Sequence, residues 1–385
     1  MPTNVESNQR GGTLVADKMY LVSADAHIVE PPELWEQRLD KRFRDRAPKV
    51  SQLEYDGVMV DVWHVEHMDP VPVGGFVGAS AKGDALREAF RQGFAAAPKS
   101  VWDPAERLVE QDLDGVSAEV LYNTWCMMLF HLDDVELRAA CFRAYNDHAA
   151  EYTSYAPTRM FGVGAIDVAD IDAAVAELER IAANGLRGAS ITGFPPLDRP
   201  FHSPIYDKFW AAAQDLSMPI SLHTGTGVRG FGGFGNGTFA NYIMNPFEIQ
   251  LSVADIIFGG VFDRFPGFKL VLAEADVSWL PHLMYRMDHA YDKFDSARMA
   301  TLSMLPSEYV TQRGLLATFQ FEDRNVGFTV DILGPEHLAW ATDYPHIETK
   351  FPYSQAAAAG SVADLTADQA ELITSANALR YYGRD

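Results

Sequence analysis

The feature that most constrains the fold is a regular alternation of short apolar runs and helical patterns along the 385 residues. Eight runs rich in β-branched residues occupy 19–27, 116–123, 160–168, 188–193, 219–225, 269–275, 315–322 and 338–346. Helical periodicity between them includes 170–184, 207–217, 279–294 and 363–382. Because strands buried on both faces read as nearly continuous apolar runs, the pattern favours a parallel sheet covered by helices. Eight such units predict an α/β chain folded as a closed (β/α)8 TIM barrel.

The structural alternative is an open, doubly wound sheet that binds a dinucleotide. Such a fold carries a GxGxxG turn directly after its first strand, where the glycines let the backbone approach the pyrophosphate. Residues 27–30 of this chain read His-Ile-Val-Glu instead. The dinucleotide interpretation is therefore weak.

Two segments interrupt the alternation. Residues 28–102 hold more Pro and Gly than a barrel helix tolerates, and we interpret them as a cap inserted between the first strand and the first barrel helix. Residues 224–242 mix glycine with phenylalanine and read as a mobile lid over an apolar substrate, the alternative being a disordered surface loop. The domain prediction is a flexible segment over 1–18 and a single barrel domain over 19–385.

The amino-acid composition limits the kinds of partner and the cellular setting that the protein can have. With 31 basic against 53 acidic residues the net charge is -22, which disfavours nucleic acid and anionic membranes and leaves a small-molecule substrate as the expected partner. No apolar run is long enough for a membrane span, and the first residues do not resemble a secretory leader. Cys126 and Cys141 show no CxxC spacing, so we expect reduced thiols and a cytoplasmic protein.

Polar residues end several of the apolar runs. Asp25 and His27 end the first, His223 lies near the end of the fifth, and Glu274 and Asp343 fall in the sixth and eighth. Residues two apart on a strand point to the same side, so Asp25 and His27 can reach one ion. Singly, each residue has an ordinary structural explanation, such as hydrogen bonding or turn chemistry. Together they lie at the end of the barrel where active sites form.

Four motifs carry a resemblance to a known family: SADAHIVEPPELW, PISLHTG, LVLAEADVSWLPHLMYRMD and WATDYPHIETKFP. The sequence resembles the amidohydrolase-related family that includes aminocarboxymuconate-semialdehyde decarboxylase. The resemblance runs from about Met19 to the C-terminus and implies a (β/α)8 barrel with one divalent metal ion. It implies that Asp25, His27, His223 and Asp343 hold the ion, and that the protein is a homodimer.

The chain departs from the family pattern at two positions. The decarboxylases for which the family is named have a catalytic His at the end of the sixth strand, where this chain has Glu274, so the transfer of decarboxylation is open to question. Asp25 replaces a His that many members use, which makes the ligand set richer in carboxylate. Fe and Mn therefore suit the site as well as Zn does. Glu274 would also be able to bridge a second ion.

The expected chemistry centres on Asp343. Beside the ion it would act as a base toward water in hydrolysis, or as an acid toward the substrate carbon in decarboxylation. Glu274 would hydrogen-bond the water. His346, three residues beyond Asp343, would orient the substrate, support the ligands without contacting the ion, or have a purely structural role. Weaker candidates, for which a structural or surface role is the default, are His202, the HxxH pair His64 and His67, and Arg187, Arg229 and Arg286.

The predicted function is a metal-dependent hydrolase or nonoxidative decarboxylase. Its substrate would be a small to medium organic acid, ester, lactone or amide, cyclic or apolar in character. One alternative is a non-heme iron oxygenase, mononuclear or dinuclear, on the same barrel, because a centre rich in carboxylate and His can hold iron. Another is a binding barrel without catalysis, which the set of candidate ligands makes the weakest of the three.

Overall fold

A computed structural model describes residues 18–55, 57–227, 238–294, 300–320, 322 and 324–383. Nearly all of the predicted flexible segment, residues 1–18, lies outside this part of the chain. Eight parallel strands form one sheet whose order follows the sequence. They are β1 (Leu21–Ile28), β5 (Val116–Asn123), β6 (Met160–Ala165), β7 (Gly188–Ile191), β8 (Ile220–His223), β9 (Lys269–Ala273), β10 (Gly314–Phe319) and β11 (Leu338–Trp340). The predicted (β/α)8 barrel is confirmed.

The barrel closes where the chain leaving β11 meets β1. The amide of Asp343 donates to the carbonyl of Asp25 over 2.9 Å, and the amide of His27 donates to the carbonyl of Tyr344 over 2.8 Å. These bonds join residues that follow β11 to the second half of β1. The closing seam therefore holds three of the predicted site residues together through their backbones.

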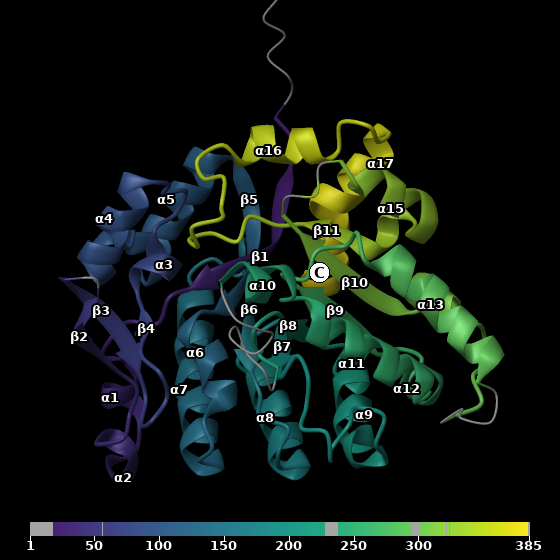
Figure 1. Cartoon of the computed structure of the whole chain (residues 1–385), viewed down its shortest axis with the longest axis horizontal. Helices are drawn as coiled ribbons and strands as arrows, with labels where there is room; N and C mark the ends of the chain where they lie inside the picture. The colour runs from purple at the N-terminus through teal and green to yellow at the C-terminus, as the bar shows by residue number, and fades with distance from the viewer. Residues whose placement is uncertain are drawn as a thin grey trace, which may run out of the picture.

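Helices surround the sheet on its outside (Figure 1). The helices of eight residues or more that follow the insertion are α5 (Pro104–Asp114), α7 (Val135–Thr153), α8 (Ile171–Ala183), α9 (Asp207–Asp215), α11 (Phe247–Phe258), α13 (Leu280–Lys293), α15 (Val326–Leu333) and α16 (Ser354–Ser361). Shorter ones are α6 (Trp125–Met128), α10 (Thr238–Ile243), α12 (Val261–Arg264), α14 (Pro306–Gln312), α17 (Ala367–Glu371) and α18 (Asn377–Tyr382).

Helix α8 shows how the local sequence sets these elements. The side chain of Asp170 accepts a hydrogen bond from the amide of Ala173, which caps the first turn. Ala174, Leu178 and Ile181 recur at helical spacing and are buried, so one face of the helix packs against the core. The predicted range, 170–184, therefore agrees with the observed helix to within one residue at each end.

The predicted insertion between β1 and α5 contains a small antiparallel sheet as well as short helices. Its elements are α1 (Leu34–Arg38), α2 (Lys41–Arg44), β2 (Lys49–Tyr55), β3 (Val58–His64), β4 (Val71–Pro72), α3 (Gly74–Val77), α4 (Asp84–Gln92) and two 3-10 turns (Gly93–Ala96, Lys99–Val101). The Asp-Gly pair between β2 and β3 is typical of a tight hairpin turn, so the hairpin could have been predicted from the sequence. Trp63 of β3 stacks on Trp125 of α6 with ring centroids 5.8 Å apart, which fixes this sheet against the barrel.

Three predicted segments differ from the structure. The eighth strand ends at Trp340, so the rest of 338–346 forms turns after the strand. The helix expected over 363–382 begins only at Ala367, because Thr366 caps that helix, and it contains a π-helical turn, Leu372–Ala376. In the predicted lid, residues 228–237 lie outside the described residues, but 238–243 form helix α10 rather than irregular chain. Within the described residues, no helix is both long and apolar enough to cross a membrane.

Candidate metal centre

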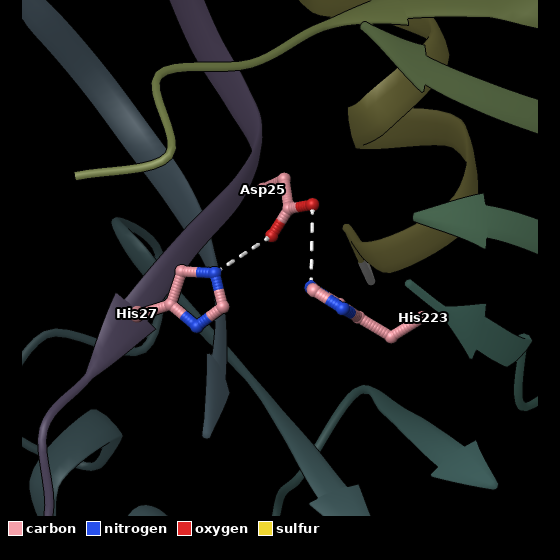
Figure 2. A group of neighbouring side chains, drawn as sticks. All are labelled: Asp25, His27 and His223. Atoms are coloured by element: carbon pink, nitrogen blue, oxygen red, sulfur yellow. Dashed lines mark ion pairs between the residues drawn. The ribbon is translucent and has the colours of Figure 1, made fainter. Parts of the chain in front are cut away.

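Asp25, His27 and His223 converge at the carboxyl ends of β1 and β8 (Figure 2). The two carboxylate oxygens of Asp25 face different histidines: Oδ1 lies 3.5 Å from His27 Nε2, and Oδ2 lies 3.6 Å from His223 Nε2. Asp343 Oδ1 approaches His27 Nε2 to 3.1 Å. All four side chains are almost completely buried. The structure thus brings together the four residues that the sequence pattern singled out.

Backbone carbonyls orient both histidines. His27 Nδ1 lies 2.8 Å from the carbonyl oxygen of Asn123, and His223 Nδ1 lies 3.0 Å from that of Thr224. A carbonyl only accepts hydrogen bonds, so each Nδ1 carries the proton and donates it. Each Nε2 is then left with a lone pair that points into the centre, which is the usual arrangement of histidines that bind metals.

The atoms that face the centre lack hydrogen-bond partners. Both carboxylate oxygens of Asp25, Oδ1 of Asp343 and Nε2 of His27 and His223 are buried with none. Lone pairs facing lone pairs repel one another, whereas a cation between them would be bound by all. Ligand atoms around an ion at about 2.1 Å stand roughly 3.0–3.4 Å apart, close to the spacing seen here. These residues therefore fit a divalent metal ion.

A second acidic group adjoins the first. Glu274 Oε2 lies 3.5 Å from His223 Nε2, and Glu274, Asp343 and Glu348 offer oxygens close enough to share an ion. Burial, together with the negative charges of Asp343 and Asp25, raises the pKa of Glu274 well above its usual value. Burial also raises the pKa of Glu348. The site therefore favours the protonated form of Glu274 more than water does, which suits an acid or a water-binding group.

Glu274 and Asp343 share an unusual backbone conformation. Their φ angles are 50° and 55°, in the left-handed region that residues other than glycine seldom adopt. Such conformations are strained and persist where the surrounding structure imposes them, often at functional sites. The strain places both carboxylates at the centre, just beyond the ends of β9 and β11.

His346 lies against the centre from the side of the closing seam. Its Nδ1 is 2.9 Å from Asp343 Oδ1, and its ring stacks on that of His27 with centroids 4.0 Å apart. Burial favours the neutral form of Asp343, but the neighbouring His346 outweighs burial and lowers the pKa of that carboxyl. Asp343 thus favours its ionised form, which can bind a cation.

A cavity of about 130 Å³ opens beside Glu274. Its lining includes Tyr242 and Ile243 of α10, Phe319, and the carboxylates of Glu348 and Asp276. The hydroxyl of Tyr242 hydrogen-bonds to Glu348, which ties α10 to the edge of the centre. Glu348 and Tyr242 were not among the residues predicted from the sequence. Glu348 could have been found from its place in the loop after the eighth strand, because such loops form the active face of these barrels.

The weaker candidates lie elsewhere. His202 pairs with Asp255, as expected of a structural histidine. His67 is 69% exposed, and His64 is the last residue of strand β3. Arg187 directly precedes β7, at the end of the strands opposite the centre, and Arg286 is exposed on α13. The prediction for Arg229 falls outside the described residues.

The chain resembles known proteins in sequence. The sequence model of the amidohydrolase family matches residues 125–384. The 2-amino-3-carboxymuconate-6-semialdehyde decarboxylase of Dictyostelium discoideum is 25% identical over 304 residues, covering 76% of this chain and 80% of the relative. The gamma-resorcylate decarboxylase of Polaromonas sp. is 26% identical over 220 residues, or 53% of this chain and 65% of the relative.

Solved structures share the fold over nearly the whole chain. An amidohydrolase from Mycobacterium avium subsp. paratuberculosis has a TM-score of 0.76 at 19% identity, covering 96% of this chain and 99% of its own. A dihydroxybenzoic acid decarboxylase from Polaromonas sp., solved with manganese and the inhibitor 2-nitroresorcinol, has a TM-score of 0.63 at 16% identity, covering 94% and 97%. At these identities the likeness establishes the fold.

Proposed function

Because this chain belongs to the amidohydrolase family, we propose that it is a metal-dependent nonoxidative decarboxylase of a small to medium organic acid that carries a ring. One observation carries the proposal. The lone pairs of Asp25, His27, His223 and Asp343 meet, buried and without donors, at the carboxyl ends of the barrel strands. That is where enzymes of this fold place their chemistry. The names of the relatives support decarboxylation as the reaction.

Asp25, His27, His223 and Asp343 would hold one divalent ion, and Glu274 with Glu348 would allow a second beside it. When bound, such an ion supplies positive charge that attracts a substrate carboxylate and an adjacent oxygen. Two histidines with two carboxylates suit Mn, Fe or Zn. The manganese bound to the related Polaromonas decarboxylase supports Mn in particular.

The residues of the chain would handle the proton. In nonoxidative decarboxylation the bond between the ring carbon and the carboxylate breaks, carbon dioxide leaves, and the electron pair left on carbon takes up one proton. Asp343, ionised at rest, is placed to pass that proton from His346 to the carbon, because His346 Nδ1 lies 2.9 Å from Asp343 Oδ1. Glu274, whose pKa is raised, is a second proton store at the mouth of the cavity.

The cavity supports a ring-bearing substrate. Phe319, Ile243 and Tyr242 supply an apolar or aromatic wall, while Glu348 and Asp276 can accept hydrogen bonds from hydroxyl or amino groups. Binding there would place the substrate next to Glu274. A flat acid bearing hydrogen-bond donors matches this mixture of apolar wall and acceptors.

Hydrolysis is the second candidate, because a buried centre of two histidines and carboxylates can also activate water. Hydrolysis is favoured by one observation: Glu274 occupies the position where the family's decarboxylases have a His. The earlier alternative, a non-heme iron oxygenase, is not favoured, since the relatives are named as decarboxylases.

The test is a substrate panel on protein loaded with Mn²⁺. Hydroxybenzoic and aminobenzoic acids would be scored for carbon dioxide release, matched esters and lactones for hydrolysis, and every reaction for oxygen uptake. We expect carbon dioxide from at least one acid, with no oxygen consumed and no reaction after chelation. Hydrolysis of an ester without release from any acid would assign the site to the second candidate, and oxygen uptake would revive the oxygenase.

Three further properties are proposed with it. A homodimer is implied by the family resemblance, and light scattering would measure it. Residues 19–385 are proposed to fold as one domain, which limited proteolysis tests. A reducing, cytoplasmic setting is supported by Cys126 and Cys141, both buried and unpaired. Localisation of a tagged full-length chain would test that last point.

A further inference from the structure

Glu30 is a completely buried carboxylate that the proposed reaction does not use. It lies three residues after His27, just beyond the end of β1. Its Oε2 accepts hydrogen bonds from the amides of Thr124 and Trp125 at 3.3 and 2.8 Å, and its Oε1 from the amide of Cys126 at 2.9 Å. The carboxylate thus binds the start of the short helix α6, where no side chain of the helix itself provides a cap.

The segment that Glu30 holds touches two histidines of the centre. The carbonyl of Asn123 accepts the Nδ1 proton of His27 over 2.8 Å. The hydroxyl of Thr124 lies 3.4 Å from His346 Nε2. Asn123 and Thr124 therefore set the direction of both rings, and Glu30 anchors the backbone that follows them. A shift of this segment would turn His27 Nε2 away from Asp25.

Glutamine would not replace this carboxyl group. Three amide donors converge on its two oxygens, and a carboxyl group accepts at both, because even a protonated oxygen keeps a lone pair. Glutamine offers one acceptor oxygen, and its NH₂ group would face an amide donor. The segment would then move or leave an amide unsatisfied inside the protein.

We propose that Glu30 is a positioning residue for the metal centre, which holds the segment 123–126 so that His27 presents Nε2 to the ion and Thr124 supports His346. The inference rests on the proposed function for its metal. It predicts that Glu30 acts on metal affinity without touching the ion, as outer partners of metal ligands do. Because the readout is binding of Mn²⁺, it does not depend on which reaction the enzyme performs.

The experiment compares Glu30→Gln and Glu30→Asp with a matched control, Asp114→Asn. Asp114 is also a buried carboxylate that binds a backbone amide, that of Ser354 at 2.8 Å. It ends helix α5, just before β5 begins, and so lies at the opposite end of the barrel from the centre. For each full-length protein, the dissociation constant of Mn²⁺ would be measured by chelator competition, and the thermal midpoint recorded.

We expect Mn²⁺ to bind about 10- to 100-fold more weakly to Glu30→Gln, and more weakly to Glu30→Asp because the shorter chain cannot reach all three amides. Asp114→Asn should lower the thermal midpoint. It should leave the dissociation constant within about twofold, because distant sites in a protein are only weakly coupled. Equal Mn²⁺ affinity in the wild type and both Glu30 variants overturns the inference. If the wild type itself binds no Mn²⁺, the proposed function fails instead.

A measurement on the unsubstituted protein covers the case in which neither Glu30 variant folds. Nitrogen-15 spectra of the metal-free chain report which ring nitrogen of His27 carries the proton. We expect a single form, protonated at Nδ1, since the Asn123 carbonyl is held against it. A mixture of the two forms would show that the segment is not held, and would overturn the inference.

Discussion

The amide of Asp343 donates a hydrogen bond of 2.9 Å to the carbonyl of Asp25, and through it the last strand unit of the barrel is joined to the first. The side chains of the same two residues meet at the candidate metal centre. The backbone hydrogen bond that closes the barrel therefore also brings two candidate metal ligands together. Whatever stabilises the centre should also stabilise the closed barrel.

Metal removal should destabilise the fold. Without a cation, the unpartnered oxygens of Asp25 face the unpartnered Nε2 atoms of His27 and His223, and their lone pairs repel one another. An ion that binds only the folded state at 100 times its dissociation constant adds about 2.7 kcal/mol. We expect chelation to lower the thermal midpoint and added Mn²⁺ to restore it, as followed by calorimetry. Asp25→Asn should remove the response to Mn²⁺, and an unchanged midpoint after verified metal removal would contradict the prediction.

Asp343→Asn should abolish proton transfer. The amide cannot carry the proton, so we expect kcat to fall by about 10²- to 10⁴-fold. His346→Ala should lower kcat by a smaller factor, because Asp343 would lose the partner 2.9 Å away. His202→Ala is the matched control, since it breaks another histidine–carboxylate pair, with Asp255, away from the centre. Steady-state kinetics would be measured on all three, and a loss in His202→Ala equal to that in His346→Ala would refute the assignment.

Tyr242→Phe should weaken substrate binding more than chemistry. The lost hydroxyl frees helix α10 from Glu348 while the aromatic wall of the cavity stays. We expect KM to rise several-fold with kcat nearly unchanged, the pattern of a group that holds ground and transition states alike. Phe239→Ala is the control on the same helix, because that side chain is 84% exposed. A drop in kcat at constant KM for Tyr242→Phe would assign the hydroxyl to the chemistry.

Glu30 should make stability depend on pH. Burial raises its pKa from 4.5 to about 7, although backbone amides, first among them those of Trp125 and Cys126, act against the rise. Between those values the native state keeps a proton that the unfolded chain releases, so the unfolding free energy falls as pH increases through this window. The loss amounts to about 3 kcal/mol between pH 4.5 and 7, from about 1.4 kcal/mol per pKa unit.

Urea unfolding of metal-free protein at several pH values would measure this dependence. In Glu30→Gln the residue no longer titrates, so the decline in stability from pH 5 to 7 should be smaller by about 2 kcal/mol. Asp114→Asn serves again as the control for a substitution at a buried carboxylate. Identical pH profiles for wild type and Glu30→Gln would show that Glu30 does not titrate in this range.

Much of the architecture was evident from local patterns. The β-branched runs and the capped, periodic helices such as α8 depend on neighbouring residues, and they identified eight strands in the right order. The spacing of Asp25 and His27 likewise followed from the two-residue period of a strand. The three-stranded sheet of the insertion was missed because its hairpin signal is a single Asp-Gly pair within a stretch rich in Pro and Gly.

The sequence by itself determined the strand and helix pattern, and which polar residues end the strands, because these depend on contacts between residues close together in the chain. Only the tertiary structure decided that the backbone of Asp343 bonds to that of Asp25 and that the carboxylates of Glu348 and Glu274 lie close together. It also decided that Glu30 binds the start of α6. Those contacts join residues from distant parts of the chain. They arise when the barrel closes and its loops turn, and no local periodicity encodes the strained backbone of Glu274 and Asp343.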